Sequence, residues 1–424
     1  MSRALPISLL CLLTACAGAS STSGPVPSSA APVAASSRPE RTPLFEAAAR
    51  GQLDRVRALL AEGASPDEAV RHGLTPLIIS GYAGHVAVVR ALLEAGADPN
   101  LPNDDGEHAL ITCAASPAAN EIVPILLQAG AAHGHVDQHG RQALAVQAQE
   151  GHHGAVTALL HAGADVHHVD GAGQTALHSA AMRGDARVVG ALLAAGARPD
   201  LANRYSARPL ALAAARGHGE VVQSLLDAGV SLEGETESQL TALGHAVVGG
   251  HLEVVRLLAD RVPTLRAGRA GAGLGLAAAA GHADVVSLLL EREAAPDGLD
   301  ERGLSALMWA AVRGHLDAAT RLLDGGATPD LQGPDGVSAL LLGAHAGQTE
   351  IVTLLLDRGA ALEQTNPQGG TALRAAAEQG HLETVRLLLA RGASRHATDT
   401  YGLRPIDYAR QNQHTWVVRA LSLP

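Results

Sequence analysis

The sequence predicts an all-α solenoid, in which about twelve helix–turn–helix units stack in a row with short β-hairpin or turn fingers between them. One column of the sequence recurs every 33 residues, apart from one step of 34 and one of 31. Two apolar stripes with helical spacing follow the members of this column, and the residues between copies are polar and rich in Gly, Pro, Asp and Asn. The column members are Thr42, Thr75, His108, Gln142, Thr175, Arg208, Thr241, Ala272, Ser305, Ser338, Thr371 and Arg404.

The copy at residues 170–202 shows how one unit is built. Thr175 is expected to cap a first helix that ends at Gly184, and a second helix is expected to end at Gly196. The first helix carries a narrow apolar stripe formed by Leu177, Ala180 and Ala181. The second helix carries a wider one formed by Val188, Val189, Leu192 and Leu193. A single unit cannot bury these stripes alone, so neighbouring units must stack.

These copies resemble ankyrin repeats. The pattern D-x-x-G-x-T-P-L-H-x-A, G-H, V-V, L-L and G-A-D of that family is matched at Asp170, Gly173, Thr175, Leu177, His178, Val188, Val189, Leu192, Leu193, Gly196 and Ala197. The resemblance covers about nine-tenths of the chain and implies an ankyrin-repeat solenoid over residues 42–424. One departure is that the His after Leu is kept only at His178. We therefore expect the hydrogen bonds of this His to be mostly absent or replaced in the other copies.

The start of the chain has a different character. Residues 1–15 carry one charge, Arg3, followed by a short apolar run, which is typical of a secretory signal peptide. The sequence LTAC at residues 13–16 resembles the bacterial lipoprotein cleavage box, which implies that Cys16 becomes an acylated N-terminus. Ala17 then favours an outer-membrane lipoprotein that faces the periplasm. The alternative is an ordinary signal peptide in which Cys16 is incidental.

Two further stretches interrupt the regular pattern. Residues 16–41 are rich in Ser, Ala and Pro, so we expect a disordered tether with a reach of about 25–30 Å. Residues 261–275 are rich in Gly and Arg and are two residues short, and Val262 and Glu293 replace the Gly that ends other second helices. We expect the weakest junction of the array there.

Composition excludes several classes of partner. The net charge of −11 argues against nucleic acid and against unaided binding to anionic lipid. After signal removal Cys113 is expected to be the one thiol that is not acylated, so no disulfide is predicted. The sequence contains no G-x-S-x-G, H-E-x-x-H, P-loop or C-x-x-C motif, and we predict a monomer that is not an enzyme and binds no cofactor or metal.

The 21 histidines fall into groups. Seven follow Gly between the two helices of a repeat, where a structural role is expected: His85, His152, His218, His251, His282, His315 and His381. Seven others cluster in one region: His133, His135, His139, His153, His161, His167 and His168. His135 and His168 are 33 residues apart, so they could share a metal across neighbouring turns, or be solvated loop residues.

The ankyrin resemblance places partner contacts on a concave face, at turn tips and at the ends of first helices. Tyr and Arg are usual interface anchors, and three of the four Tyr occur at these positions. The alternative is an ordinary solvated surface. The predicted protein-binding residues are His72, Tyr82, Gln149, Glu150, Met182, Arg183, Tyr205, Arg216, Arg302, Arg313, Glu378, Gln379 and Tyr401.

The favoured function is therefore a membrane-tethered, non-enzymatic scaffold that binds another protein. Two alternatives stay open at this point. One is a His-rich metal-binding or stress-protective envelope protein, and the other is a secreted effector or inhibitor.

Overall fold

The computed structural model describes residues 39–232, 241–261 and 270–423. The chain divides into two units, Met1–Glu40 and Arg41–Pro424. The described residues form 24 α-helices, which confirms the all-α prediction. Cys16 and the predicted signal peptide lie outside the described residues. None of the described helices combines the length and the apolar character that crossing a bilayer requires.

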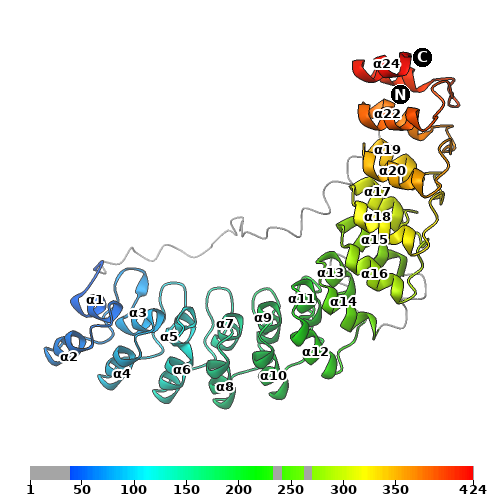
Figure 1. Ribbon diagram of the computed structural model, residues 1–424. Helices are drawn as coiled ribbons and strands as arrows, with labels where there is room; N and C mark the ends of the chain where they lie inside the picture. Colours follow the sequence, from blue (N-terminus) through cyan, green and yellow to red (C-terminus); the bar gives the residue numbers. More distant parts are fainter. Residues whose placement is uncertain (1–38, 233–240, 262–269, 424) are drawn as a thin grey trace. The chain divides into compact units, whose positions relative to one another are not determined.

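The helices alternate between the first and second helix of each repeat (Figure 1). The first helices are α1 (Pro43–Ala49), α3 (Pro76–Ala83), α5 (Ala109–Thr112), α7 (Ala143–Glu150), α9 (Ala176–Arg183), α11 (Pro209–Ala215), α13 (Ala242–Val248), α15 (Ala270–Ala280), α17 (Ala306–Arg313), α19 (Ala339–His345), α21 (Ala372–Gln379) and α23 (Pro405–Gln411). The second helices are α2 (Leu53–Ala61), α4 (Val86–Glu94), α6 (Ala119–Gln128), α8 (His153–His161), α10 (Ala186–Ala194), α12 (Gly219–Asp227), α14 (Leu252–Ala259), α16 (Ala283–Glu291), α18 (Leu316–Asp324), α20 (Thr349–Asp357), α22 (Leu382–Ala390) and α24 (Thr415–Ser422). The described residues also include two short 3₁₀-helices, η2 (Arg71–Gly73) and η3 (Cys113–Ala115).

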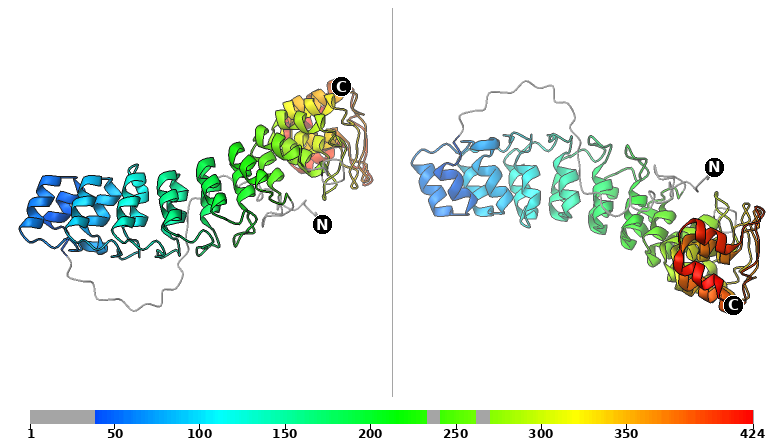
Figure 2. Two further views of the ribbon diagram at one scale, coloured as in Figure 1. Left: turned by 90° about the horizontal axis from the view of Figure 1, so that it is seen from below. Right: turned by 90° about the horizontal axis from the view of Figure 1, so that it is seen from above.

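Each repeat stacks on the next through like elements. First helices contact first helices and second helices contact second helices. Figure 1 shows the two rows, and Figure 2 shows successive repeats side by side. The rows of first helices pack more closely in most steps, because small side chains such as Ala180 and Ala181 line them and are fully buried. The second helices contribute larger residues to the same core, and Val188, Val189 and Leu192 of α10 are also fully buried.

Local capping explains where the first helices begin. Thr75 is extended, and its Oγ1 accepts a hydrogen bond from the Ile78 N–H at 3.2 Å, while Pro76 takes the first helical position. In the fifth repeat the buried His178 supports the cap instead. Its Nδ1 lies 2.9 Å from Thr175 Oγ1 and its Nε2 lies 3.3 Å from the Ala207 carbonyl oxygen. The ninth repeat replaces this His by Met308, whose sulfur accepts from the Ser305 N–H at 3.4 Å.

The third repeat departs from the pattern for a local reason. Its first helix is reduced to α5 and η3, which stop before Ser116. Ser116 precedes Pro117 and is extended (φ −100°, ψ 137°), as expected because a following proline disfavours helical backbone. Pro124 is accommodated inside α6.

The Gly-His histidines have the predicted structural role. The Nε2 of His218, for example, lies 3.2 Å from the Met182 carbonyl oxygen of the preceding repeat. Equivalent bonds are made by His85, His152, His251, His282, His315 and His381. His414 makes the same bond to Glu378, although Gln413 stands in the place of the glycine. Each of these rings joins its repeat to the one before it.

The predicted hairpins are mostly turns. Within the described residues, isolated antiparallel bridges join Val136 to Gln142, Leu299 to Ser305 and Gln332 to Ser338. The predicted weak junction includes residues 262–269, which lie outside the described residues. On its two sides, α13 contacts α15 and α14 contacts α16.

Candidate functional site

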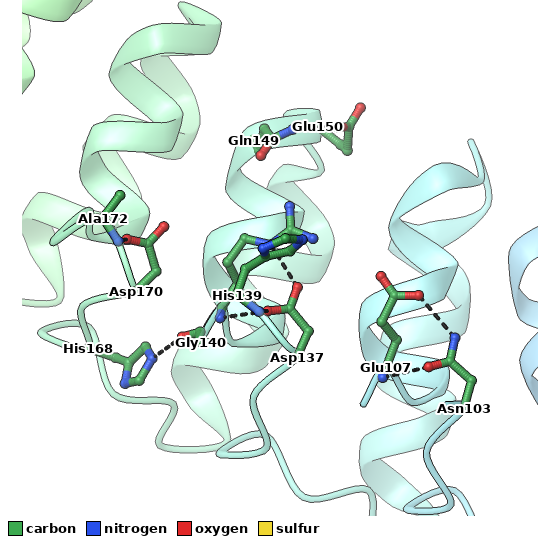
Figure 3. A network of polar contacts seen from close by, with 11 residues as sticks. Asn103, Glu107, Asp137, His139, Gly140, Gln149, Glu150, His168, Asp170 and Ala172 are labelled. Atoms are coloured by element: carbon green, nitrogen blue, oxygen red, sulfur yellow. Dashed lines mark hydrogen bonds and ion pairs between the residues drawn. The ribbon is translucent and has the colours of Figure 1, made fainter. Parts of the chain in front are cut away.

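The turn before each first helix, which we call a finger, has a repeated internal framework. In the fifth repeat the Asp170 Oδ1 accepts from the Ala172 N–H at 2.8 Å and from the Gln174 N–H at 2.9 Å. Asp or Asn side chains commonly stabilise turns in this way. The same pair of bonds, to the second and fourth following residues, is made by Asn103, Asp137, Asn203, Asp300, Asn366 and Asp399. Figure 3 shows three of these fingers.

Charge reinforces the framework of the fourth finger. The Arg141 Nε lies 2.7 Å from Asp137 Oδ2, whose side chain is almost completely buried. Burial opposes ionisation of this carboxyl, but the Arg141 N–H and guanidinium and the His139 N–H hold its pKa below the usual value. Asp137 is therefore ionised at neutral pH.

Adjacent fingers are also joined to one another. The residue at the tip of a finger, two positions after the Asp or Asn, accepts a backbone hydrogen bond from the next finger. The His139 carbonyl oxygen accepts from the Gly171 N–H at 2.9 Å, and the Ala172 carbonyl oxygen accepts from the Arg204 N–H at 3.0 Å. The tips therefore stand at equivalent positions along a ladder of backbone bonds.

The tip side chains differ from finger to finger, although the framework that holds them is the same. Among the predicted residues, Tyr205 and Tyr401 are tips and are 57% and 75% exposed. Arg302 is a third exposed tip. The tips on the common framework are Asp105, His139, Ala172, Tyr205, Arg302, Gln368 and Tyr401.

Of the other predicted residues, His72 lies in η2, where its carbonyl oxygen accepts a backbone hydrogen bond from the Asp104 N–H, and the rest end first helices. Figure 3 shows Gln149 and Glu150 at one end of α7, with the finger residues Asp137 and His139 nearer its other end. Tyr82 lies in the last turn of α3 and is 57% exposed. The remaining residues at such ends are Met182 and Arg183 of α9, Arg216 after α11, Arg313 of α17, and Glu378 and Gln379 of α21.

The predicted residues of repeats four to six lie on neighbouring elements. Their first helices α7, α9 and α11 contact one another in succession. We call this group the central patch: Gln149, Glu150, Met182, Arg183, Tyr205 and Arg216. A depression of about 370 Å³, open to solvent, lies beside it and is lined by Arg183, Gly184, Asp185, Ala186, Arg187 and Glu220.

Two predicted residues outside the central patch are engaged within the protein. The half-buried Glu378 lies 3.0 Å from the guanidinium of Arg374, which stands 4.9 Å from the ring centre of Tyr408. Arg302 is 6.0 Å from the ring centre of Trp309. These side chains are held by neighbours, so they are less available to a partner than Tyr205 or Arg216.

Sequence reasoning missed three exposed apolar residues on the fingers. Val136, Val169 and Leu299 are 44%, 47% and 38% exposed. All three stand six residues before the repeat column, and Val136 and Val169 are 33 residues apart in adjacent repeats. Comparing that column between copies would have found them. The exposed Trp416 of α24 was also missed.

Each ring of the histidine pair considered for a metal contacts a different group. His168 Nε2 lies 2.7 Å from the Gly140 carbonyl oxygen (Figure 3). The His135 ring instead faces His108, at 5.0 Å between ring centres. In the part of the chain that the structure describes, no three His, Cys, Asp or Glu side chains are grouped to hold a metal ion.

Cys113 has a free thiol that lies inside the core. It is completely buried and contacts Gln147, whose Nε2 lies 3.4 Å from the sulfur. Burial raises its pKa to about 12. The reactive thiolate is therefore scarcely populated at neutral pH.

Comparison with known proteins agrees with this architecture. A family model described as ankyrin repeats (3 copies) matches residues 31–103, 95–170, 145–234, 177–267, 272–333 and 340–423. These matches span most of the chain. No curated protein matched it.

Proposed function

The chain belongs to the ankyrin-repeat family, and from this we propose that it is a non-enzymatic scaffold that binds a partner protein through its finger tips and first-helix ends. Ankyrin repeats are in general modules for protein–protein interaction. The observation that carries the proposal is the contrast within the fingers. Their Asp or Asn framework repeats, whereas the tip changes from the half-buried Ala172 to the exposed Tyr205 and Arg302.

The central patch is the proposed centre of binding. It combines an exposed Tyr205 with two exposed arginines, Arg183 and Arg216, at the ends of the neighbouring helices α9 and α11. A rigid aromatic ring and planar guanidinium groups suit a protein interface. The arginines favour a partner that presents carboxylates opposite them.

The second part of the proposal is a membrane tether. We propose that acylation of Cys16 holds the protein at the outer membrane facing the periplasm, and that residues 16–41 link it to the repeats. The lipoprotein-like LTAC sequence at residues 13–16 supports this proposal. Several acyl chains would be needed for firm anchoring, because one chain binds a bilayer only marginally.

A cross-linked pull-down from envelope extract tests the scaffold. We expect Tyr205→Ala and Arg216→Ala each to reduce recovery of a specific partner severalfold, because central anchors carry most of the binding energy of an interface. Arg90→Ala, an exposed arginine of the second helix α4, is the matched control and should have no effect. If Tyr401→Ala abolishes capture while Tyr205→Ala does not, binding is centred elsewhere in the array. If none of the variants alters capture, the proposed face is wrong.

Mass spectrometry of the mature N-terminus tests the tether separately. We expect an acylated Cys16, and we expect Cys16→Ser to release the protein from the membrane fraction. A non-acylated N-terminus in the culture medium would refute the tether and favour a secreted effector. The scaffold proposal does not depend on this result.

A further inference from the structure

His108 is an anomaly in the repeat column. Most other copies place Thr or Ser there, and the hydroxyl of Thr75, for example, caps a helix. His108 is only 1% exposed, and neither of its ring nitrogens has a hydrogen-bond partner. His178, the other fully buried histidine, has partners on both nitrogens. A buried polar group without partners calls for an explanation, and an unseen ion is one.

His135 faces His108 from the next finger. The two ring centres are 5.0 Å apart and the ring planes make an angle of 74°. With zinc–nitrogen bonds of about 2.0–2.1 Å, two imidazoles on one tetrahedral ion have ring centres roughly 5 Å apart. The separation of the two ring centres therefore matches that of two imidazoles bound to one ion.

Further unpartnered atoms lie in the same stretch. The buried Gln142 Oε1 and His133 Nδ1 have no hydrogen-bond partner. Gln142 Nε2 donates to the Gly134 carbonyl oxygen at 3.1 Å, and Gly134 stands between His133 and His135 in the chain. The Gln142 amide is therefore held next to the residue that precedes His135, and water can complete a coordination shell.

We infer that His108 and His135 form a binding site for one divalent transition-metal ion of the zinc class at the junction of repeats three and four. Imidazole nitrogens with an amide or water oxygen suit zinc and similar ions. A ligand histidine must be neutral. Burial, and next the neighbouring His135, lower the pKa of His108 to about 4, so its ring is neutral at neutral pH.

Zinc titration by calorimetry, at neutral pH and on the full chain without a His tag, tests this inference. We expect His135→Ala to weaken the tightest site by at least about tenfold, since even supporting residues of a metal site contribute that much. His135 is exposed, so this variant should keep the fold. His108→Thr, which restores the column residue of Thr75 and Thr175, should have the same effect, with its helicity checked by circular dichroism.

His167→Ala and His168→Ala are the matched controls from the same region. His167 is exposed, and His168 Nε2 already bonds the Gly140 carbonyl oxygen, so neither should change the affinity. Unchanged affinity in His135→Ala would overturn the inference and leave an edge-to-face ring contact. Equal weakening by His168→Ala would overturn it too, because zinc would then bind generally to surface histidines. Neither outcome bears on the proposed protein-binding face.

Discussion

The close packing of His218 against the preceding repeat can be tested with two glycines that flank α10, Gly184 and Gly196. Both have φ of 88°. A Cβ added at Gly184 would lie 2.6 Å from Cε1 and Cγ of His218, whereas one added at Gly196 would meet no heavy atom within 4 Å. Gly196→Ala therefore reports the left-handed backbone alone, and Gly184→Ala adds a clash with the next repeat.

The expected magnitudes differ accordingly. A left-handed alanine costs about 1–2 kcal/mol, and this cost is common to both variants. Overpacking typically costs a further 1–3 kcal/mol or so. We expect Gly196→Ala to lower the free energy of unfolding by about 1 kcal/mol, after the smaller entropy of its unfolded chain is counted, and Gly184→Ala to lower it by about 2–4 kcal/mol.

Urea unfolding followed by helical circular dichroism measures both variants. Amide exchange in α9 and α10 localises the effect, since arrays need not unfold in one step. The single variant His218→Ala loses the hydrogen bond to the Met182 carbonyl oxygen, which is worth about 1 kcal/mol. In the double variant with Gly184→Ala, the same substitution also removes the ring that the added methyl group would meet. The double variant should therefore be less unstable than the sum of the single variants. Equal losses for Gly184→Ala and Gly196→Ala, or strict additivity, would refute this account.

Four further predictions follow from other residues. Ser206 has φ of 56° in a finger position that other repeats give to glycine, so Ser206→Gly should raise the free energy of unfolding by about 1 kcal/mol in thermal denaturation, and a decrease would contradict this. The folded-state pKa of His108, about 4, lies below its ordinary 6.5. His108 therefore contributes stability that is fully present above pH 6.5 and is lost as the pH falls toward 4. His108→Thr should flatten the dependence of unfolding free energy on pH in that window, and an unchanged slope would refute the assignment. Arg358 lies 2.8 Å from Asp324 of the preceding repeat, but both side chains are exposed, so Arg358→Gln should cost no more than about 1 kcal/mol and less in 1 M salt. Limited proteolysis should cut the array first within residues 261–275, and a first cut elsewhere in it would count against a weak junction there.

Much of the fold was predictable because its causes are local or periodic. The Thr75 hydroxyl caps a helix by accepting a hydrogen bond from the amide three residues later, and Pro76 suits the next position whatever surrounds it. The 33-residue step also predicts which elements are neighbours, so His218 could be expected to serve the junction with the preceding repeat. The finger tips Tyr205 and Tyr401 were found in the same way.

The pairing of side chains between fingers was not predictable. Equal spacing left open whether His135 and His168 share a metal or are solvated loop residues, because spacing determines where the backbones lie and not where the rings point. The His168 ring is drawn to the Gly140 carbonyl oxygen, while His135 reaches the buried His108 beside a shortened first helix. Likewise, the apolar type of Val136 suggests burial, yet it is 44% exposed.

The sequence alone therefore determined the number, order and register of the repeats, because each repeat is specified by short-range signals and by contacts with its two neighbours. The tertiary structure decided which side chains within that register are left for a partner or an ion. That choice depends on which hydrogen-bond acceptors and which free space the adjoining repeat offers, and these differ wherever one copy departs from the pattern.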